Sequence, residues 1–287
     1  IGGALAMLIA LAGTPLVIAY FRGHGLSQSI RDDVAVDHAE TKAGTPTMGG
    51  TAIVLAAVIG FMVAHVTELR FTPAGLLVVF VFVGMAAVGF VDDYIKVRMR
   101  RSLGLSKTAK FLGQATVAGV FAYVGPAFAG VPRNISLVGE LNIVSDLPFW
   151  AYAIWVFLIL AGFSNAVNLT DGLDGLAAGS STLVLGAYTL VGFWMSRNSG
   201  DYAFVGQQES LDVAVLSAAA LAACAGFLWF NAPPARIYMG DTGSLALGGL
   251  LAALAMVTNT QLLLVVIGGL FVLETGSVMA QVVAFRA

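Results

Sequence analysis

Residues 73–96 read PAGLLVVFVFVGMAAVGFVDDYIK. The run from Pro73 to Val91 carries no charged side chain, and two adjacent acids, Asp92 and Asp93, follow it directly. Because a hydrocarbon core about 30 Å thick needs roughly 17–25 mostly apolar residues per helix, this run predicts a membrane-spanning helix. Adjacent carboxylates at its end repel each other and face the negative pole of the helix dipole, a cost that a loop would avoid. The stretch therefore predicts a span with a functional site at its end.

The same apolar pattern recurs along the chain. Of the 287 residues, 59% are hydrophobic and only 10% are charged, whereas soluble domains carry about 25% charged residues. The single cysteine, Cys224, excludes an intrachain disulfide. We therefore expect an all-α polytopic membrane protein, one integral-membrane domain over residues 1–287. Its nine visible transmembrane helices are expected at 1–20, 47–66, 73–91, 109–125, 148–165, 176–195, 211–230, 243–258 and 261–283.

One segment between the expected spans has a strand pattern. Residues 133–144 hold two short apolar stretches on either side of Gly139-Glu140. Such a pattern predicts a short β-hairpin. The orientation of the chain places this hairpin on an external loop, since cytoplasmic loops carry an excess of Lys and Arg. If the first helix runs inward, 11 of the 14 Lys and Arg residues lie inside, and three remain outside: Arg70, Arg133 and Arg197.

The first polar motif at the inner face is KAGTPTMGG, residues 42–50. In a structural reading, Thr45 caps a helix that begins at Pro46, and the two glycines permit close helix packing. In a functional reading, Lys42 and the free amides at the helix start hold an anion.

The second motif follows the first-quoted span. Asp92 and Asp93 either form a solvated helix end or serve a divalent metal or proton transfer. The basic residues behind them either anchor the helix at the inner face or attract an anionic lipid or nucleotide. These residues are Lys96, Arg98, Arg100, Arg101, Lys107 and Lys110.

The third motif, SNAVNLTDGLDG at 164–175, repeats polar side chains every third residue: Asn165, Asn168, Asp171 and Asp174. A helical path gathers them on one side. Capping of the next helix explains one acid but not two Asn and two Asp together.

The fourth motif is NAPPARIYMGDTGS, residues 231–244. Asp241 or Thr242 would cap a helix starting at Ser244. Alternatively, Asp241 binds Mg²⁺ while nearby amides approach a phosphate. Tyr238 either stacks on a base or anchors the chain at the interface.

Together the motifs resemble those of the polyprenyl-phosphate N-acetylhexosamine-1-phosphate transferases, most closely the phospho-N-acetylmuramoyl-pentapeptide transferases. The similar stretches are GTPTMGG (44–50), VDDYIK (91–96), NAVNLTDGLDG (165–175) and MGDTGSLALGG (239–249). The resemblance implies transfer of a phospho-sugar from UDP-MurNAc-pentapeptide to undecaprenyl phosphate, which gives lipid I and UMP in peptidoglycan synthesis. It further implies Mg²⁺, a bacterial inner membrane with the site on its cytoplasmic face, and a homodimer; no nucleic acid partner is expected.

The resemblance also implies roles for residues of this chain. Asp241 and Asn168 would bind the metal, while Asp92, Asp93 and Asp241 would be catalytic. Substrate would be bound by Lys42, Lys96, Lys107, Asn165, Asp171, Asp174, Asn231 and Tyr238. Members of the family have ten helices and a His-rich cytoplasmic motif, so we expect the biological protein to continue past Ala287 with both. Tyr238 stands where the family has a Phe.

Two other functions are compatible with the motifs. A GlcNAc-1-phosphate transferase would use the same chemistry, although those relatives typically read Gly-Asp-Ala-Gly-Ser where this chain reads Gly-Asp-Thr-Gly-Ser (240–244). An ion-coupled transporter would carry its acids near the membrane midplane, whereas here they are expected at one face.

Overall fold

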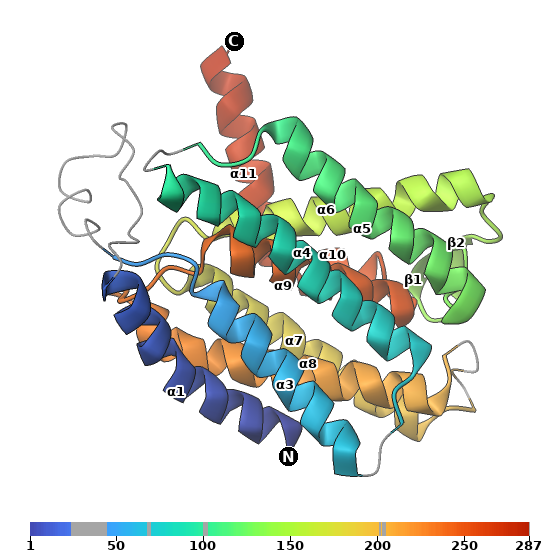
Figure 1. The fold of residues 1–287 in the computed structure, drawn as a ribbon. Helices are drawn as coiled ribbons and strands as arrows, with labels where there is room; N and C mark the ends of the chain where they lie inside the picture. The colour runs from blue at the N-terminus through green and yellow to red at the C-terminus, as the bar shows by residue number, and fades with distance from the viewer. Residues whose placement is uncertain (24–44, 68–69, 100–102, 201, 203–204, 287) are drawn as a thin grey trace.

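The computed structural model describes residues 1–23, 45–67, 70–99, 103–200, 202 and 205–286. Long helices run roughly alongside one another, and a two-stranded hairpin lies between α5 and α6 (Figure 1). The described elements are α1 (Gly2–Gly23), α3 (Gly50–Thr67), α4 (Pro73–Arg98), α5 (Lys107–Phe128), β1 (Ile135–Val138), β2 (Leu141–Val144), α6 (Phe149–Thr170), α7 (Leu176–Arg197), α8 (Gln207–Asn231), α9 (Gly240–Val257), α10 (Leu263–Ile267) and α11 (Gly269–Arg286).

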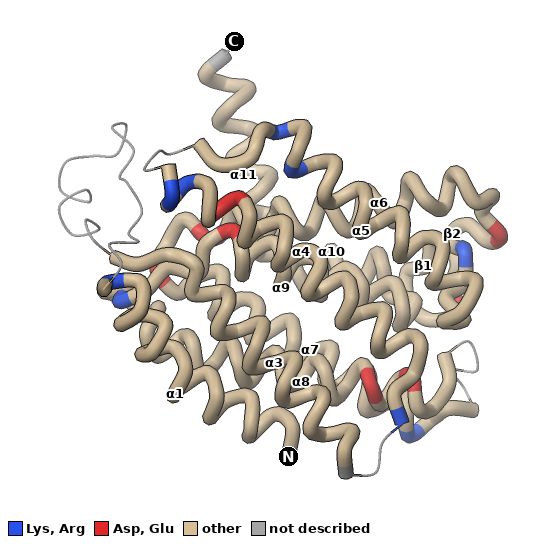
Figure 2. Tube along the Cα trace, in the orientation of Figure 1, with Lys and Arg blue, Asp and Glu red and all other residues tan. Residues whose placement is uncertain are grey.

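Within the described residues, seven helices are long and apolar enough to cross a membrane: α1 and α4 to α9. The apolar stretches Gly50–Val66 and Gly269–Phe285 are shorter. Figure 2 shows the described charged residues near the two ends of the bundle, with an uncharged middle. This distribution fits a lipid-facing middle, because a charge in hydrocarbon is costly. The prediction of an all-α polytopic membrane protein is confirmed.

The ninth predicted span, 261–283, is not one continuous helix. It breaks after Ile267 into the short helix α10 and the helix α11, which projects away from the bundle (Figure 1). Two consecutive glycines, Gly268 and Gly269, lie at the break. Glycine is a poor helix former and a frequent cause of kinks, so the apolar run alone overstates the length of this helix.

The predicted hairpin is confirmed. Strands β1 and β2 pair antiparallel, with Ile135 opposite Val144. The turn between α9 and α10 holds the hairpin in place, since Gly139 N donates to Asn259 O at 3.0 Å and Ser136 N donates to the Gln261 side chain at 2.7 Å. Backbone groups at the hairpin are thus paired with the end of the central helix α9.

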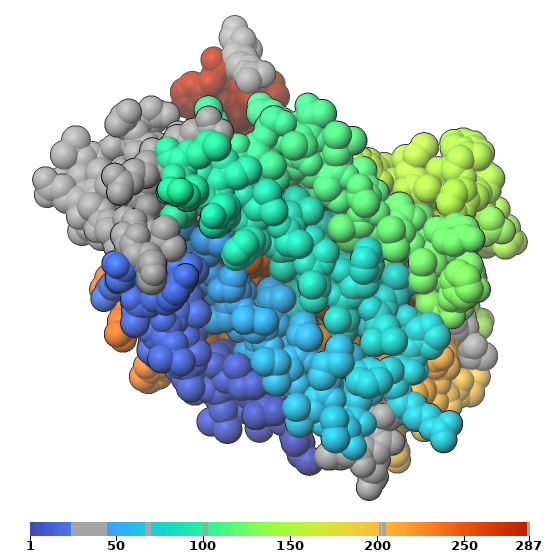
Figure 3. Space-filling model, in the orientation of Figure 1, coloured from blue at the N-terminus to red at the C-terminus, as the bar shows by residue number. Residues whose placement is uncertain are grey.

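Helix α9 forms the core of the bundle. Every residue from Asp241 to Val257 is buried, and the helix packs against α4, α6 and α3. In the space-filling view, α9 shows only as a small area between α3 and α4 (Figure 3). A Cβ at Gly248 would collide with the backbone of Phe163 in α6. Small residues therefore allow α9 to lie inside the bundle, and its first turn carries Asp241 with it.

A group of polar side chains joins helices at the end of the bundle remote from Asp92, Asp93 and Asp241. His65 Nε2 of α3 lies 3.0 Å from Asp212 Oδ1 of α8. Asp212 Oδ2 accepts hydrogen bonds from the Thr72 backbone N–H at 3.0 Å and from the Thr72 hydroxyl at 2.7 Å. Thr72 in turn caps α4 by accepting from Gly75 N at 3.0 Å. This contact joins three helices at the end remote from the acidic motifs.

The predicted orientation can be tested by labelling. We expect a cysteine placed at Ala235, between α8 and α9, to resist a membrane-impermeant thiol reagent in intact cells. A cysteine at Glu140, the exposed hairpin turn, should react. The native Cys224 is fully buried and adds no background. Ready labelling at position 235 together with protection at 140 would reverse the assigned orientation.

Candidate active site

Three acids from two helices form a compact cluster at the end of the bundle that holds the acidic motifs. Asp92 and Asp93 lie in the last turns of α4, and Asp241 lies in the first turn of α9. Their ligand oxygens all lie within 4.8 Å of one another, and all three residues are buried. The two helices approach closely because Gly89 lies against the Asp241 backbone, where a Cβ would clash. The structure thus unites the second and fourth sequence motifs.

Asp93 caps helix α9. Its Oδ1 accepts from Asp241 N at 3.1 Å, and its Oδ2 accepts from Thr242 N at 2.9 Å and from the Thr242 hydroxyl at 2.7 Å. A carboxylate at a helix N-terminus satisfies free N–H groups and faces the positive pole of the helix dipole. Asp93 therefore fixes the turn that carries Asp241.

The structure corrects two predicted helix starts. Helix α9 begins at Gly240, so Asp241 and Thr242 lie inside its first turn and the cap comes from another helix. Helix α3 begins at Gly50, so Thr45 does not cap it. Residues 46–50 instead run beside the segment before α9, where Tyr238 N donates to Pro46 O at 2.8 Å and Gly49 N donates to Tyr238 O at 2.9 Å. Neighbouring segments, which local patterns do not reveal, satisfy these backbone groups.

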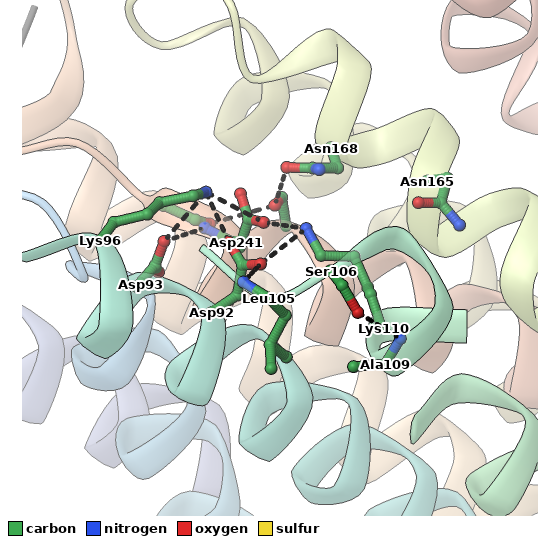
Figure 4. Close-up of polar contacts among 12 residues, drawn as sticks. Asp92, Asp93, Lys96, Leu105, Ser106, Ala109, Lys110, Asn165, Asn168 and Asp241 are labelled. Carbon is green, nitrogen blue, oxygen red and sulfur yellow. Dashed lines mark hydrogen bonds and ion pairs between the residues drawn. The ribbon is translucent and has the colours of Figure 1, made fainter. Parts of the chain in front are cut away.

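Two lysines enter the acidic cluster. Lys96 Nζ lies 2.6 Å from Asp92 Oδ2 and 3.3 Å from Asp241 Oδ2. Lys110 Nζ lies 3.3 Å from Asp92 Oδ1 and makes a close ion pair with Asp241 (Figure 4). Lys96 was a predicted site residue, but Lys110 was not. The predicted Lys107 is exposed at the start of α5.

The connection before α5 explains why Lys110 rather than Lys107 enters the cluster. Leu105 N donates to Asp92 Oδ1 at 2.9 Å, and Ser106 caps α5 by accepting from Ala109 N at 3.1 Å. These two bonds set the rotation of α5. The basic run indicated that a lysine was available, but only the capping position determines which one points inward.

The donor set of the cluster suits a divalent cation. Carboxylate oxygens are the ligands that hard cations such as Mg²⁺ and Ca²⁺ prefer. Asn168 of α6 faces the cluster, and its Oδ1 accepts from the Ser244 hydroxyl at 2.8 Å (Figure 4). Ser244 lies one turn after Asp241 on α9. The three buried acids can therefore bind a metal, and the Asn168 oxygen lies beside them.

Two further predicted residues, Asp174 and Asn231, join the loops at the same end. Asp174 Oδ2 accepts from Ala235 N at 3.0 Å. Asn231 Oδ1 accepts from Gly175 N at 3.2 Å, while its Nδ2 donates to Ile237 O at 3.0 Å. These bonds connect the loop after α6 to the segment before α9. Lys42, the remaining predicted residue of the first motif, lies outside the described residues.

Asp171 and Tyr238 also lie at this end. Asp171 follows α6 directly, and burial, together with the negative charges of Asp93 and Asp241, raises the pKa of its carboxyl well above the usual range. Burial and the nearby Asp174 raise the pKa of the Tyr238 phenol. Both residues are half-buried, so a bound ligand can reach them.

Sequence comparison defines the class of the protein. Residues 75–259 match the Glycosyl transferase family 4, and residues 42–54 match signature 1 of the phospho-N-acetylmuramoyl-pentapeptide-transferases. The matched region spans α4 to α9, which contains the whole acidic cluster. With its apolar helices, the chain is a multi-pass membrane transferase.

Curated relatives narrow the assignment. Phospho-N-acetylmuramoyl-pentapeptide-transferases of Frankia alni and Saccharopolyspora erythraea are 50% and 44% identical to the chain, over all of it and 83% of each relative. That of Thermobifida fusca is 48% identical over 98% of the chain and 83% of the relative. The chain belongs to the phospho-N-acetylmuramoyl-pentapeptide-transferase family.

Proposed function

We propose that the chain transfers phospho-MurNAc-pentapeptide from UDP-MurNAc-pentapeptide to undecaprenyl phosphate, giving lipid I and UMP for peptidoglycan synthesis. The observation that carries this proposal is the buried cluster of three acids and two lysines at one end of a membrane bundle of this family. The protein would act in the bacterial cytoplasmic membrane, with the cluster on the cytoplasmic face. A homodimer is proposed from the family resemblance alone.

Both reactants are anionic phosphates, so the protein must neutralise charge and align the two groups. Lys96 pairs with Asp92, and Lys110 pairs with Asp241. In the complex, their ammonium groups would turn toward phosphate oxygens and hold the pyrophosphate near the cluster. The exposed Lys107 would attract phosphate from outside the cluster.

The cation of this site is proposed to be Mg²⁺, held by Asp241 and Asn168. When bound, Mg²⁺ stabilises the charge that develops on the leaving UMP. Asp93 would maintain the position of Asp241, because it fixes the first turn of α9. Lys96 and Lys110 both lie against Asp241, the proposed ligand.

Asp92 is proposed to orient the phosphate of the lipid acceptor. Leu105 N and Lys110 hold its Oδ1, and Lys96 holds its Oδ2, so its carboxylate has a fixed direction. A phosphate monoester has a second pKa of about 6 and is mostly a dianion at pH 7. Attack therefore needs alignment more than it needs a base, and Asp93 contributes to that alignment through α9.

The uridine end is proposed to lie at Asp171, Asp174, Asn231 and Tyr238. We expect Tyr238→Ala to weaken UDP-substrate binding about tenfold and Tyr238→Phe to leave it nearly unchanged, because base–aromatic stacking is worth about 1–3 kcal/mol and needs only the ring. The backbone of Tyr238 pairs with Pro46 and Gly49, and both variants keep these backbone bonds, so the fold should survive both changes. Equal affinities in equilibrium binding assays would show that Tyr238 is only an interface residue.

A GlcNAc-1-phosphate transferase is the competing function within this chemistry. The two candidate functions are distinguished by supplying the purified protein with UDP-GlcNAc or with UDP-MurNAc-pentapeptide at equal concentration. We expect UMP release with the second donor only. Release with UDP-GlcNAc alone would assign the other function.

A further inference from the structure

A pair of amide side chains, Gln114 and Asn165, lies one helical turn from residues of the candidate site. Gln114 of α5 lies one helical turn after Lys110, and Asn165 of α6 lies one turn before Asn168. Asn165 Nδ2 donates to Gln114 Oε1 at 3.2 Å and to the backbone oxygen of Ala161 at 2.8 Å. Gln114 is fully buried, whereas Asn165 is only partly buried. Helices α5 and α6 thus each carry an amide side chain one turn beyond a residue of the candidate site, and the two amides are hydrogen-bonded to each other.

These bonds determine which way Asn165 points. The Ala161 carbonyl can only accept, so the NH₂ group of Asn165 must face it, and the second N–H is used by Gln114. Both donors of the amide are therefore occupied. Figure 4 shows the Asn165 oxygen on the side of the acidic cluster and the nitrogen directed away from it. Asn165 can offer a ligand only an acceptor oxygen.

The buried amide of Gln114 is only half satisfied. Its Nε2 has no hydrogen-bond partner among the described residues. A buried donor without an acceptor lowers stability. If the only role of position 114 were to pack α5 against α6, an apolar side chain would therefore be more stable there than Gln114. What Gln114 does provide is an oxygen that fixes the Asn165 amide.

We infer that the side-chain oxygen of Asn165 accepts a hydrogen bond from the transferred sugar, either from a hydroxyl or from the acetamido N–H. Gln114 is then a positioning residue for Asn165. The inference rests on the proposed function. Along α6 and its following loop, the order is Asp174 and Asp171 at the uridine end, Asn168 beside the pyrophosphate, and then Asn165. The sugar is the next group of the substrate in that direction. A phosphate has no donor for an acceptor-only amide, so the sugar fits this position and the phosphates do not.

The test compares UDP-MurNAc-pentapeptide with three analogues that each lack one sugar donor: the 4-deoxy sugar, the 6-deoxy sugar, and a sugar with an ester in place of the acetamide. For the native protein, one analogue should lose about tenfold in kcat/KM, the effect of one hydrogen bond. The kcat/KM of Asn165→Leu should be about tenfold below the native value with the full substrate, and it should not fall further with that analogue. Equal values for all analogues with the native protein, or an undiminished analogue effect in Asn165→Leu, would overturn the inference.

Gln114→Met separates positioning from packing. We expect it to reproduce the kinetic pattern of Asn165→Leu without lowering the Tm, since it removes an unsatisfied donor. A lower Tm with native kinetics would show a structural contact only. Thr116→Val, which changes an exposed polar residue on the same helix, is the control and should match the native protein. If Asn165→Leu does not fold, the kinetics and the Tm of Gln114→Met test the inference. Absence of UMP release by the native protein would instead refute the proposed function.

Discussion

Replacing Asp241 by Asn should lower kcat by about a thousandfold or more and raise the Mg²⁺ concentration needed for residual activity. The change removes the negative charge that would bind the cation while keeping the shape of the side chain, and electrostatic groups of this kind carry effects of that order. Asp241 lies in the acidic cluster and pairs with both lysines. Activity measured across a Mg²⁺ titration gives both values.

The same substitution at an exposed acid is the matched control. Asp146 lies just before Phe149, the first residue of α6, whereas the site lies at the other end of that helix, and Asp146 is exposed. Asp146→Asn should keep native activity and Mg²⁺ dependence, and both variants should keep a native thermal transition. Near-native turnover of Asp241→Asn at ordinary Mg²⁺ would contradict the proposed role of Asp241 as a metal ligand.

Asp93→Asn should reduce kcat about a hundredfold while UDP-substrate binding changes much less. Three donors of the first turn of α9 surround the Asp93 carboxylate, and an Asn would place an NH₂ group against one or two of them. The turn would shift, and a displacement of about 1 Å at a reacting group can cost that much in rate. Loss of the cap should also lower the free energy of unfolding by about 1–2 kcal/mol.

A milder variant serves as the comparison for Asp93. Thr242→Val removes one of the three donors and leaves both backbone N–H groups in place. Its effect on kcat should be much smaller than that of Asp93→Asn. A pure binding defect in Asp93→Asn, with unchanged kcat, would contradict the assignment of Asp93 to the alignment of the reacting groups.

The spans were predictable because a membrane helix is specified by composition and length. The run 73–91 lies within α4, and the strands of residues 133–144 form the hairpin. The ninth span was predicted as one apolar run, whereas α10 ends at Ile267 and α11 begins at Gly269. Composition identifies what can enter the membrane, whereas the path of the chain depends on local helix breaks.

The site was less predictable for a different reason. Sequence patterns pointed to Asp92, Asp93 and Asp241, which the structure brings together. They could not show that Asp93 caps another helix, because that contact crosses 149 residues of chain to Thr242. Nor could they select Lys110 or Gln114, since the rotation of α5 depends on its cap and on the tether to Asp92. Such roles depend on tertiary contacts.

The most direct test of the proposed function is UMP release by the purified protein. We expect one UMP for each lipid I formed from UDP-MurNAc-pentapeptide, and release only when both undecaprenyl phosphate and Mg²⁺ are present. The stoichiometry follows from a single transfer of the phospho-sugar, and the two requirements follow from the proposed acceptor and cation. Absence of UMP release with all components present, or equal release without the lipid phosphate, would contradict the proposed transfer.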